Sequence, residues 1–314
     1  TASSGVSSGV IGGQVTSPSF AIATSDRVAG KSSAAATFSF TATAGGALAI
    51  GSTITLTYPS GFFSGTGSPA ATINGVSGGA VATPTSTQIV VTTGAAVAAS
   101  SGVTVTVTGL TMGAATAGSS NGVTIATSVD QTASSGVSSG VIGGQVTSPL
   151  FEIATSDRVA GKSSAAATFS FTTTAGGALA AGSNITLTYP SGFFASAGSP
   201  SVQISGSGPT GSVATPTDTQ IVITTAAQAI NASTAVTVTV TGLTMGGTPT
   251  AGGGVSVATS VDQTASASVA SGVIGGAVTS VTFGVALADR VANKTSAAAT
   301  FSFTTTAGGA LAAG

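Results

Sequence analysis

The sequence of 314 residues has no histidine, cysteine or tryptophan, and its charged residues are six Lys or Arg and seven Asp or Glu. Without Cys and His it cannot build the usual zinc or haem sites, a disulfide, a cysteine nucleophile or a Ser-His-Asp triad. Six scattered cations form no basic face for nucleic acid. We therefore expect a protein that is not an enzyme, needs no cofactor and does not bind nucleic acid.

The low charge also indicates where the protein is located. Hydrophobic residues make up 42% of the chain, which is enough to bury a core, whereas charged residues make up 4%. An average soluble domain has about 25% charged residues. Low charge with abundant Gly, Ser and Thr favours an extracellular protein of the cell surface or an appendage. Small and polar residues interrupt every apolar run before about 18 residues, so no membrane span is expected. The polar opening stretch indicates a removed leader or a fragment.

The strongest pattern is a long internal repeat. TASSGVSSGVIGGQVTSP at 1–18 recurs unchanged at 132–149, and a looser version starts at Thr264. The period of about 131 residues is the size of a whole domain rather than of a solenoid coil. The third copy has too few strands to bury a sheet face, so we expect a longer natural protein. The predicted domains are repeat 1 at 1–131, repeat 2 at 132–263 and a partial repeat 3 at 264–314.

Within a repeat, apolar and polar residues alternate with a period of two, which predicts antiparallel strands with one buried face. Turn residues cluster between them, as at 59–61 and at Asn74-Gly75. No amphipathic helix is predicted, so the fold class is an all-β antiparallel β-sandwich. The residues expected to share buried or strand-defining faces are Phe20, Ile22 and Thr24; Phe38 and Phe40; Ile54, Leu56 and Tyr58; Ile89 and Val91; Val103, Val105 and Val107; and Val123, Ile125 and Val129.

The order of motifs carries a resemblance. An FxF strand is followed by AGGALAxGSxITLTYPSGFF, by TQIVVTT or TQIVITT, by VTVTGLT and by a closing strand that ends in ATSVD. This order resembles the immunoglobulin-like tandem repeats of bacterial and archaeal surface proteins, which include adhesin stalks, S-layer proteins and extracellular fibres. The resemblance implies spacers, lattice units or fibre subunits, and it brings no catalytic residues.

Sheets that expose so little charge lack the usual protection against edge pairing. We therefore expect self-assembly of copies of the chain into a filament or surface lattice. One alternative is a passive adhesin stalk whose binding head lies elsewhere. Another is a non-catalytic module of a secreted polysaccharide-active enzyme.

Most of the charges belong to one repeated cluster. Its copies contain Gly30, Gly161 and Asn293 between the charges, and these residue types tolerate a left-handed backbone, so a tight loop is predicted. The cluster is interpreted as an ion-paired turn between the first two strands, or alternatively as a contact between neighbouring domains or subunits. Its members are Asp26, Arg27 and Lys31; Asp157, Arg158 and Lys162; and Asp289, Arg290 and Lys294.

Two further sets of polar residues are candidates for ligands. Asp130 and Asp262 end the last strand of each full repeat, and with Asp157 and Asp289 they are weak candidates for calcium between domains. Plain turn-forming Asp residues are the other reading. Sequons for N-linked glycans lie at Asn184, Asn231 and Asn293.

The segment that joins one repeat to the next is predicted to be either a flexible linker or an extra strand. Apolar residues in it favour the strand, which would pair with an adjacent domain's sheet edge in the same chain or in another. The apolar residues are Val10, Ile11 and Val15 in the first copy and Val141, Ile142 and Val146 in the second.

Overall fold

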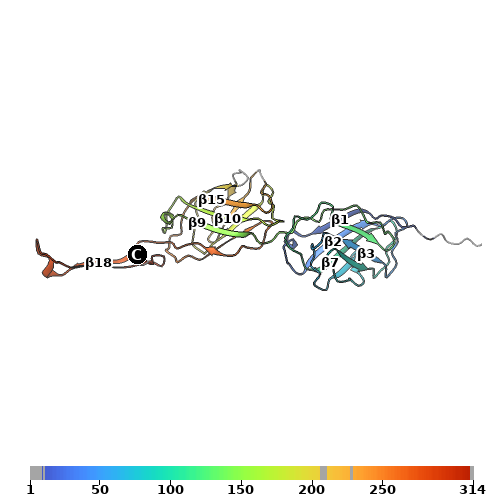
Figure 1. Cartoon of the computed structure of the whole chain (residues 1–314), viewed down its shortest axis with the longest axis horizontal. Helices are drawn as coiled ribbons and strands as arrows, with labels where there is room; N and C mark the ends of the chain where they lie inside the picture. The colour runs from blue at the N-terminus through green and yellow to red at the C-terminus, as the bar shows by residue number, and fades with distance from the viewer. Residues whose placement is uncertain (1–8, 10, 206–210, 227–228, 312–314) are drawn as a thin grey trace, which may run out of the picture. The chain divides into compact units, whose positions relative to one another are not determined.

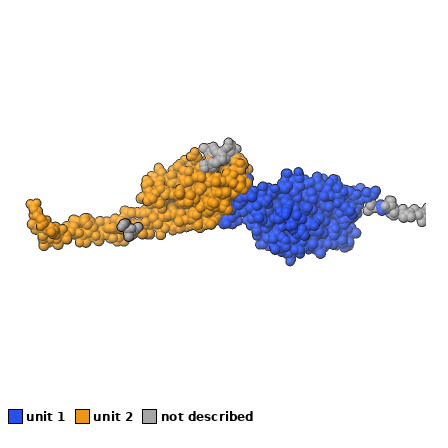
Figure 2. Space-filling view, viewed as in Figure 1, with its two compact units in different colours: residues 1–145, 174–178, 261–264 blue, residues 146–173, 179–260, 265–314 orange. Residues whose placement is uncertain are grey.

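A computed structural model describes residues 9, 11–205, 211–226 and 229–311 (Figure 1), so the predicted linker-strand residue Val10 lies outside the described residues. The chain is all-β, with antiparallel pairing in every sheet. Its contacts group into two compact units (Figure 2). Unit 1 comprises Thr1–Gln145, Thr174–Ala178 and Val261–Thr264, and unit 2 comprises Val146–Thr173, Leu179–Ser260 and Ala265–Gly314. The helices of the described chain are three-residue turns, none able to cross a lipid bilayer.

The first sandwich lies within unit 1 and consists of two sheets, with strand orders β1-β2-β7-β4-β5 and β6-β3-β8. Side chains of both sheets meet in one buried core, as expected for an immunoglobulin-like β-sandwich. A short 3-10 turn, η1 (Thr24–Asp26), joins the first two strands. The strands are β1 (Thr16–Ile22), β2 (Ala34–Thr41), β3 (Thr53–Thr57), β4 (Ala70–Ile73), β5 (Val76–Ser77), β6 (Gln88–Thr92), β7 (Gly102–Leu110) and β8 (Thr124–Thr127).

The second sandwich repeats this plan, with strand orders β12-β15-β10-β9 and β13-β14-β11-β16-β17. Its 3-10 turn is η2 (Thr155–Asp157). The last strand, β17, comes from the looser third copy of the joining segment, so that segment supplies an edge strand to the sandwich before it. The strands are β9 (Thr147–Ile153), β10 (Ala165–Thr172), β11 (Asn184–Thr188), β12 (Ser201–Ser205), β13 (Ser212–Val213), β14 (Gln220–Thr224), β15 (Ala235–Leu243), β16 (Gly254–Thr259) and β17 (Val269–Ala270).

Alternation of side chains explains why these segments are strands. On β2 every second residue is buried, including Phe38 and Phe40, while Thr and Ser occupy the other face. Burying one such ring contributes roughly 1.5–3 kcal/mol. The predicted faces are confirmed within the strands, but four of the residues lie beyond a strand end: Thr24 opens η1, Tyr58 follows β3, and Val123 and Val129 lie on either side of β8. Alternation alone does not fix where pairing ends, because the ends depend on the partner strand.

A hairpin was missed, although its turn was predicted. Asn74 and Gly75 have φ of 52° and 78°, and they connect the short strands β4 and β5. Positive φ at both central residues is the signature of a tight hairpin turn. The flanking strands have only four and two residues, too few for alternation to stand out.

The described part of the third copy forms one hairpin, β18 (Thr279–Val285) with β19 (Ala299–Thr304), around the turn η3 (Leu287–Asp289). The aromatic residues Phe283 and Phe301 are 62% and 70% exposed, whereas their counterparts Phe151 and Phe169 in the second sandwich are 7% and 0% exposed. Phe169 is covered because β15 and a second sheet pack around β10. As predicted, two strands do not bury a sheet face.

Candidate interaction site at the junction segment

The repeated charge cluster divides into two parts with different partners. Asp26 pairs with Lys31 at 2.8 Å, and the same pair recurs as Asp157 with Lys162 at 3.4 Å and as Asp289 with Lys294 at 2.6 Å. Gly30, Gly161 and Asn293 have φ of 71°, 72° and 61°, which confirms the left-handed position in each loop. The Lys31 hydrogen bond, followed by the N–H of Ala35, lowers the pKa of Asp26. An ion pair as exposed as that of Asp26 with Lys31 contributes about 0–1 kcal/mol to stability.

Arg27 turns away from this pair to the segment that follows the sandwich, residues 132–145, which we call the junction segment. Its Nη1 donates to the carbonyls of Ser139 at 2.8 Å and Val141 at 3.2 Å, and Nε donates to that of Ile22 at 3.4 Å. Burial lowers the pKa of Arg27. A guanidinium has five rigidly placed donors, which suits it to hold several carbonyls. This role of Arg27 could not be predicted from the local sequence, in which Asp26 is the neighbouring charge.

The junction segment is bonded to the first sandwich along its length. Val137 and Val123 exchange backbone hydrogen bonds of 2.9 and 3.0 Å, and Ile142 and Thr116 exchange two of 2.9 Å. Gly143 then accepts from the N–H of Ala29 and donates to the carbonyl of Arg27. The side chain of Ile142 is 0% exposed. The segment therefore packs as part of unit 1, whose first stretch extends to Gln145.

Two serines of the segment complete the hydrogen bonding of the sandwich. The Oγ of Ser134 accepts from the N–H of Ile125 at 3.0 Å, and the Oγ of Ser139 accepts from the N–H of Ser119 at 2.9 Å. Both serines are buried, 5% and 0% exposed. Buried backbone N–H groups need partners, so these serines have a structural role that a Ser-rich sequence alone does not reveal.

Unit 2 binds the third copy of the joining segment, which starts at Thr264, through the same kinds of backbone contact. Val269 pairs with Val255, and Ile274, 0% exposed, exchanges backbone hydrogen bonds with Thr250. Gly275 donates to the carbonyl of Arg158 at 3.0 Å and accepts from Ala160 at 2.8 Å.

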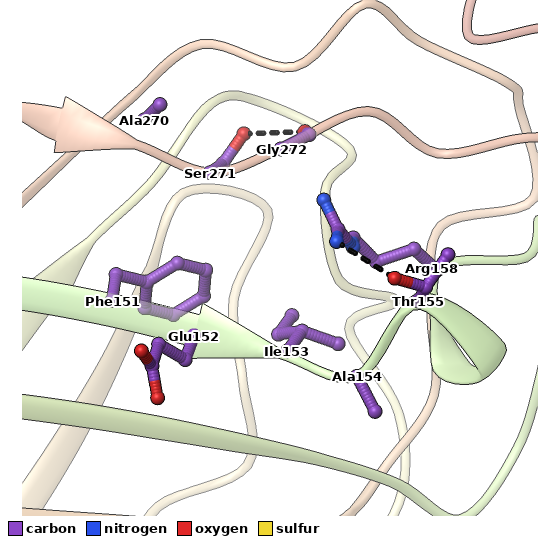
Figure 3. A pocket seen from close by; sticks show the side chains of 9 residues that line it. All are labelled: Phe151, Glu152, Ile153, Ala154, Thr155, Arg158, Ala270, Ser271 and Gly272. Carbon is purple, nitrogen blue, oxygen red and sulfur yellow. Dashed lines mark hydrogen bonds between the residues drawn. The ribbon is translucent and has the colours of Figure 1, made fainter. Parts of the chain in front are cut away.

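The arginine of unit 2 differs in its side-chain contact. Arg158 Nη2 donates to Thr155 Oγ1 at 3.2 Å, beside Gly272 (Figure 3). A hollow of about 520 Å³ lies there, between β9 and the third copy of the joining segment. Phe151 and Ser271 are among the residues that line it.

A buried carboxylate fixes the start of each full repeat to its end. Asp130 is 0% exposed; its Oδ1 accepts from Gly13 N at 2.8 Å and Thr43 Oγ1 at 2.5 Å, and its Oδ2 accepts from Thr43 N at 3.0 Å. Burial opposes the charge, but the hydrogen bonds from Thr43 and Gly13 outweigh it and hold the pKa below its usual value. Asp262 makes the same contacts with Gly144 and Thr174 within unit 1.

Glycines make these close approaches possible. A Cβ on Gly12 would lie 1.9 Å from the carbonyl oxygen of Val129, and one on Gly46 would lie 2.0 Å from Asp130 Oδ2. Gly143 faces Val261 in the same manner, at 1.9 Å. Real Cβ atoms do not come so near, so the paired glycines of VIGG and AGGA are needed for contact rather than for flexibility.

The predicted ligand residues are placed as follows. Asp130 and Asp262 face N–H and O–H donors, which a calcium ion would have to displace, whereas Asp157 and Asp289 are each paired with a lysine. No group of three His, Cys, Asp or Glu residues able to hold a metal occurs in the described ranges. The sequon residues Asn184, Asn231 and Asn293 are exposed, and their glycosylation stays a prediction.

The apolar residues of the joining segment differ in how deeply they are buried. Val15 and Val146 are each 2% exposed, and Val15 belongs to the core of the first sandwich. Ile142 is buried and Val141 half-buried, whereas Ile11 is 90% exposed.

No protein-family model and no curated protein matches the sequence. Among solved structures the chain is similar to the C-terminal domain of AspA, an antigen I/II-family protein of Streptococcus pyogenes, with 9% identity, 82% of this chain and 98% of that chain covered, and a TM-score of 0.36. The adhesion glycoprotein Srr1 of Streptococcus agalactiae is 10% identical, with 78% and 91% covered and a TM-score of 0.25. The collagen adhesin of S. aureus is 10% identical, with 79% and 88% covered and a TM-score of 0.22. These neighbours are immunoglobulin-like domains of Gram-positive surface adhesins, the class that the motifs resemble.

Proposed function

We propose that the chain is a non-catalytic structural part of an extracellular surface, and that copies of it associate into a fibre or lattice. The observation that carries this proposal is the outer face of β2 and β7. It is a ladder of Thr and Ser, with Thr37 and Thr106 hydroxyls 3.4 Å apart and those of Ser39 and Thr104 also 3.4 Å apart. The ladder contains no charged residue.

An uncharged ladder suits contact with another sheet. Charges on exposed strands normally keep sheets apart, and the ladder offers none to repel a neighbour or to be desolvated. Thr168 and Thr239 repeat the hydroxyl contact in the second sandwich, 3.3 Å apart. There Glu152 of β9 pairs with Thr168, where the first sandwich has Ala21 opposite Thr37, so the uncharged ladder is a feature of the first sandwich. Stable association needs about 800 Å² from each partner. Repeated weak contacts along a tandem chain add through effective concentration.

The test is electron microscopy with light scattering on the purified chain. We expect filaments or sheets from the natural sequence, and fewer from Thr104→Lys, which places a charge on the exposed ladder. Thr87→Lys adds the same charge at an exposed turn and should assemble as before. A monodisperse monomer from the natural sequence would contradict self-assembly and favour the adhesin-stalk alternative.

A further inference from the structure

The equivalent arginines of the three loops use their donors differently. Nε of Arg27 donates to the carbonyl of Ile22 at 3.4 Å, and Nε of Arg290 donates to that of Val285 at 2.9 Å. The Nε of Arg158 is buried and has no acceptor among the described residues. A buried N–H without a partner is costly, and such groups are rare in folded proteins. The unpaired donor therefore indicates an acceptor that comes from outside the chain.

The rest of the Arg158 guanidinium is also less occupied than that of Arg27. Arg27 Nη1 donates to two carbonyls of the junction segment. Within the described ranges Arg158 makes one side-chain hydrogen bond, from Nη2 to Thr155 Oγ1. The ion pairs of the described chain each join an aspartate to a lysine, so Arg158 has no carboxylate partner there. Its charge and several of its five N–H donors stay available to a ligand.

Arg158 lies at the wall of the hollow of about 520 Å³ between β9 and residues 270–272. Its side chain extends from the loop after β9 toward Gly272 (Figure 3). The lining residues all belong to unit 2. Ligand sites typically have volumes of about 300–1,000 Å³, so the hollow has room for a small organic molecule.

The other walls of the hollow are largely apolar. The ring of Phe151 is 7% exposed, and two alanines lie near it in the lining. The hydroxyl of Ser271 is already used, because it accepts from the N–H of Gly253 and donates to the carbonyl of Gly272, both at 2.9 Å. Arg158 is therefore the side-chain donor that the hollow offers, beside an apolar surface.

Glu152 limits the charge that a ligand can carry. It is exposed and lines the hollow, and its carboxylate lies on the other side of β9 from Ser271 and Gly272 in the view of Figure 3. One cation with an anion nearby disfavours a ligand of two or more negative charges, such as phosphate. A carboxylate has one charge, and its two coplanar oxygens match the N–H fork of a guanidinium.

We propose that the hollow beside Arg158 binds a small monocarboxylate with an apolar body. One carboxylate oxygen accepts from the Nε–H of Arg158 and the other accepts from a neighbouring N–H of the same guanidinium. The apolar body packs against Phe151. The inference is independent of the proposed function, since the site lies within one sandwich and needs no second copy of the chain.

The test is an amide NMR titration of the whole chain with hydrocinnamate, a monocarboxylate that carries a phenyl ring. We expect saturable shifts at Phe151, Arg158 and Gly272, with a dissociation constant in the millimolar range or below, as its size allows. The neutral amide of hydrocinnamate should bind at least tenfold more weakly, and inorganic phosphate should not compete. Absence of saturable shifts, equal binding of the amide or competition by phosphate would each overturn the proposal.

Variants show whether Arg158 makes the contact. Arg158→Met keeps the apolar stem and should bind hydrocinnamate at least tenfold more weakly, because it loses charge-assisted hydrogen bonds. Arg27→Met is the matched change in the first sandwich and should leave binding unchanged. Glu152→Gln removes a nearby negative charge and should bind at least as tightly.

The dispersion of the amide signals shows whether each variant is folded. If Arg158→Met is not folded, Arg158→Lys replaces it; it keeps the charge, loses the fork and should also weaken binding. Unchanged binding in a folded Arg158 variant, or a loss of binding in Glu152→Gln, would show that the ligand is held elsewhere and would overturn the assignment.

Discussion

Removal of the Asp130 carboxylate should weaken the first sandwich strongly. Asp130→Ala leaves the N–H groups of Gly13 and Thr43 and the Thr43 hydroxyl without their acceptor. Each buried donor without a partner costs about 1–3 kcal/mol. Gly13 and Thr43 are half-buried, so water satisfies part of the loss. We therefore expect the free energy of unfolding to fall by about 3–5 kcal/mol.

Differential scanning calorimetry measures this loss. For a unit of this size each kcal/mol shifts the Tm by about 2–4 °C, so the first-sandwich transition should move down by about 10 °C. Asp218→Ala is the matched control, because Asp218 is exposed and accepts from Ser191 and Gly192 near the surface. It should cost less than about 1 kcal/mol. A loss below about 1 kcal/mol for Asp130→Ala as well would refute the role given to this carboxylate.

The same carboxylate predicts a pH dependence. The folded pKa of Asp130 lies below its ordinary value, so the unfolded chain binds the proton more readily. Its contribution to stability is complete above the unfolded pKa of about 3.9 and is lost as the pH falls through the folded pKa. Unfolding free energies measured from pH 6 to pH 2 should fall more steeply for the natural chain than for Asp130→Ala. Equal slopes would contradict the assignment.

Three further changes test the junction. Arg27→Met removes two carbonyl contacts of the junction segment, and limited proteolysis should cut within 132–146 at least several-fold faster than in the natural chain; an unchanged rate would exclude the anchoring role. Gly143→Ala places a Cβ 1.9 Å from a backbone oxygen and should cost more than about 2 kcal/mol in guanidinium unfolding, whereas Gly247→Ala, with open space around it, should cost about 1 kcal/mol or less. Lys31→Met should change stability by less than about 1 kcal/mol, and a larger loss would show that the exposed pair matters more than its geometry indicates.

Strands were the part of this fold that the sequence could predict. Alternation at Phe38 and Phe40, or at Val103, Val105 and Val107, follows from a two-residue period that each strand displays by itself. The turn at Asn74-Gly75 was also local, because it depends on which residues tolerate positive φ. The ion pair of Asp26 with Lys31 could be predicted for the same reason, because the two residues lie within six residues of each other in the sequence.

The residues that hold the junction segment and the ends of each repeat in place could not be predicted from local sequence patterns. Asp130 and Gly13 are 117 residues apart, and Arg27 and Ser139 are 112 apart. Nothing in the local pattern around Asp130 distinguishes a buried acceptor from a turn, because both follow the end of a strand. The recurring glycine pairs were the one visible signal, since a glycine next to a glycine in every copy indicates close approach as readily as flexibility.

The direction of two short pairings has a consequence for a chain under tension. The entering segment at Gln14 runs parallel to Thr132, and Val28 runs parallel to Gly143. A pull on the two ends of the sandwich would slide these parallel neighbours past each other along their length. Their hydrogen bonds, such as Gly143 N to Arg27 O at 3.0 Å, would then have to break together and not one after another. The hydrogen bonds are then loaded in shear. We expect the sandwich to resist force up to a threshold and then to unfold abruptly, because bonds loaded in shear share the force, whereas bonds that are unzipped break one at a time.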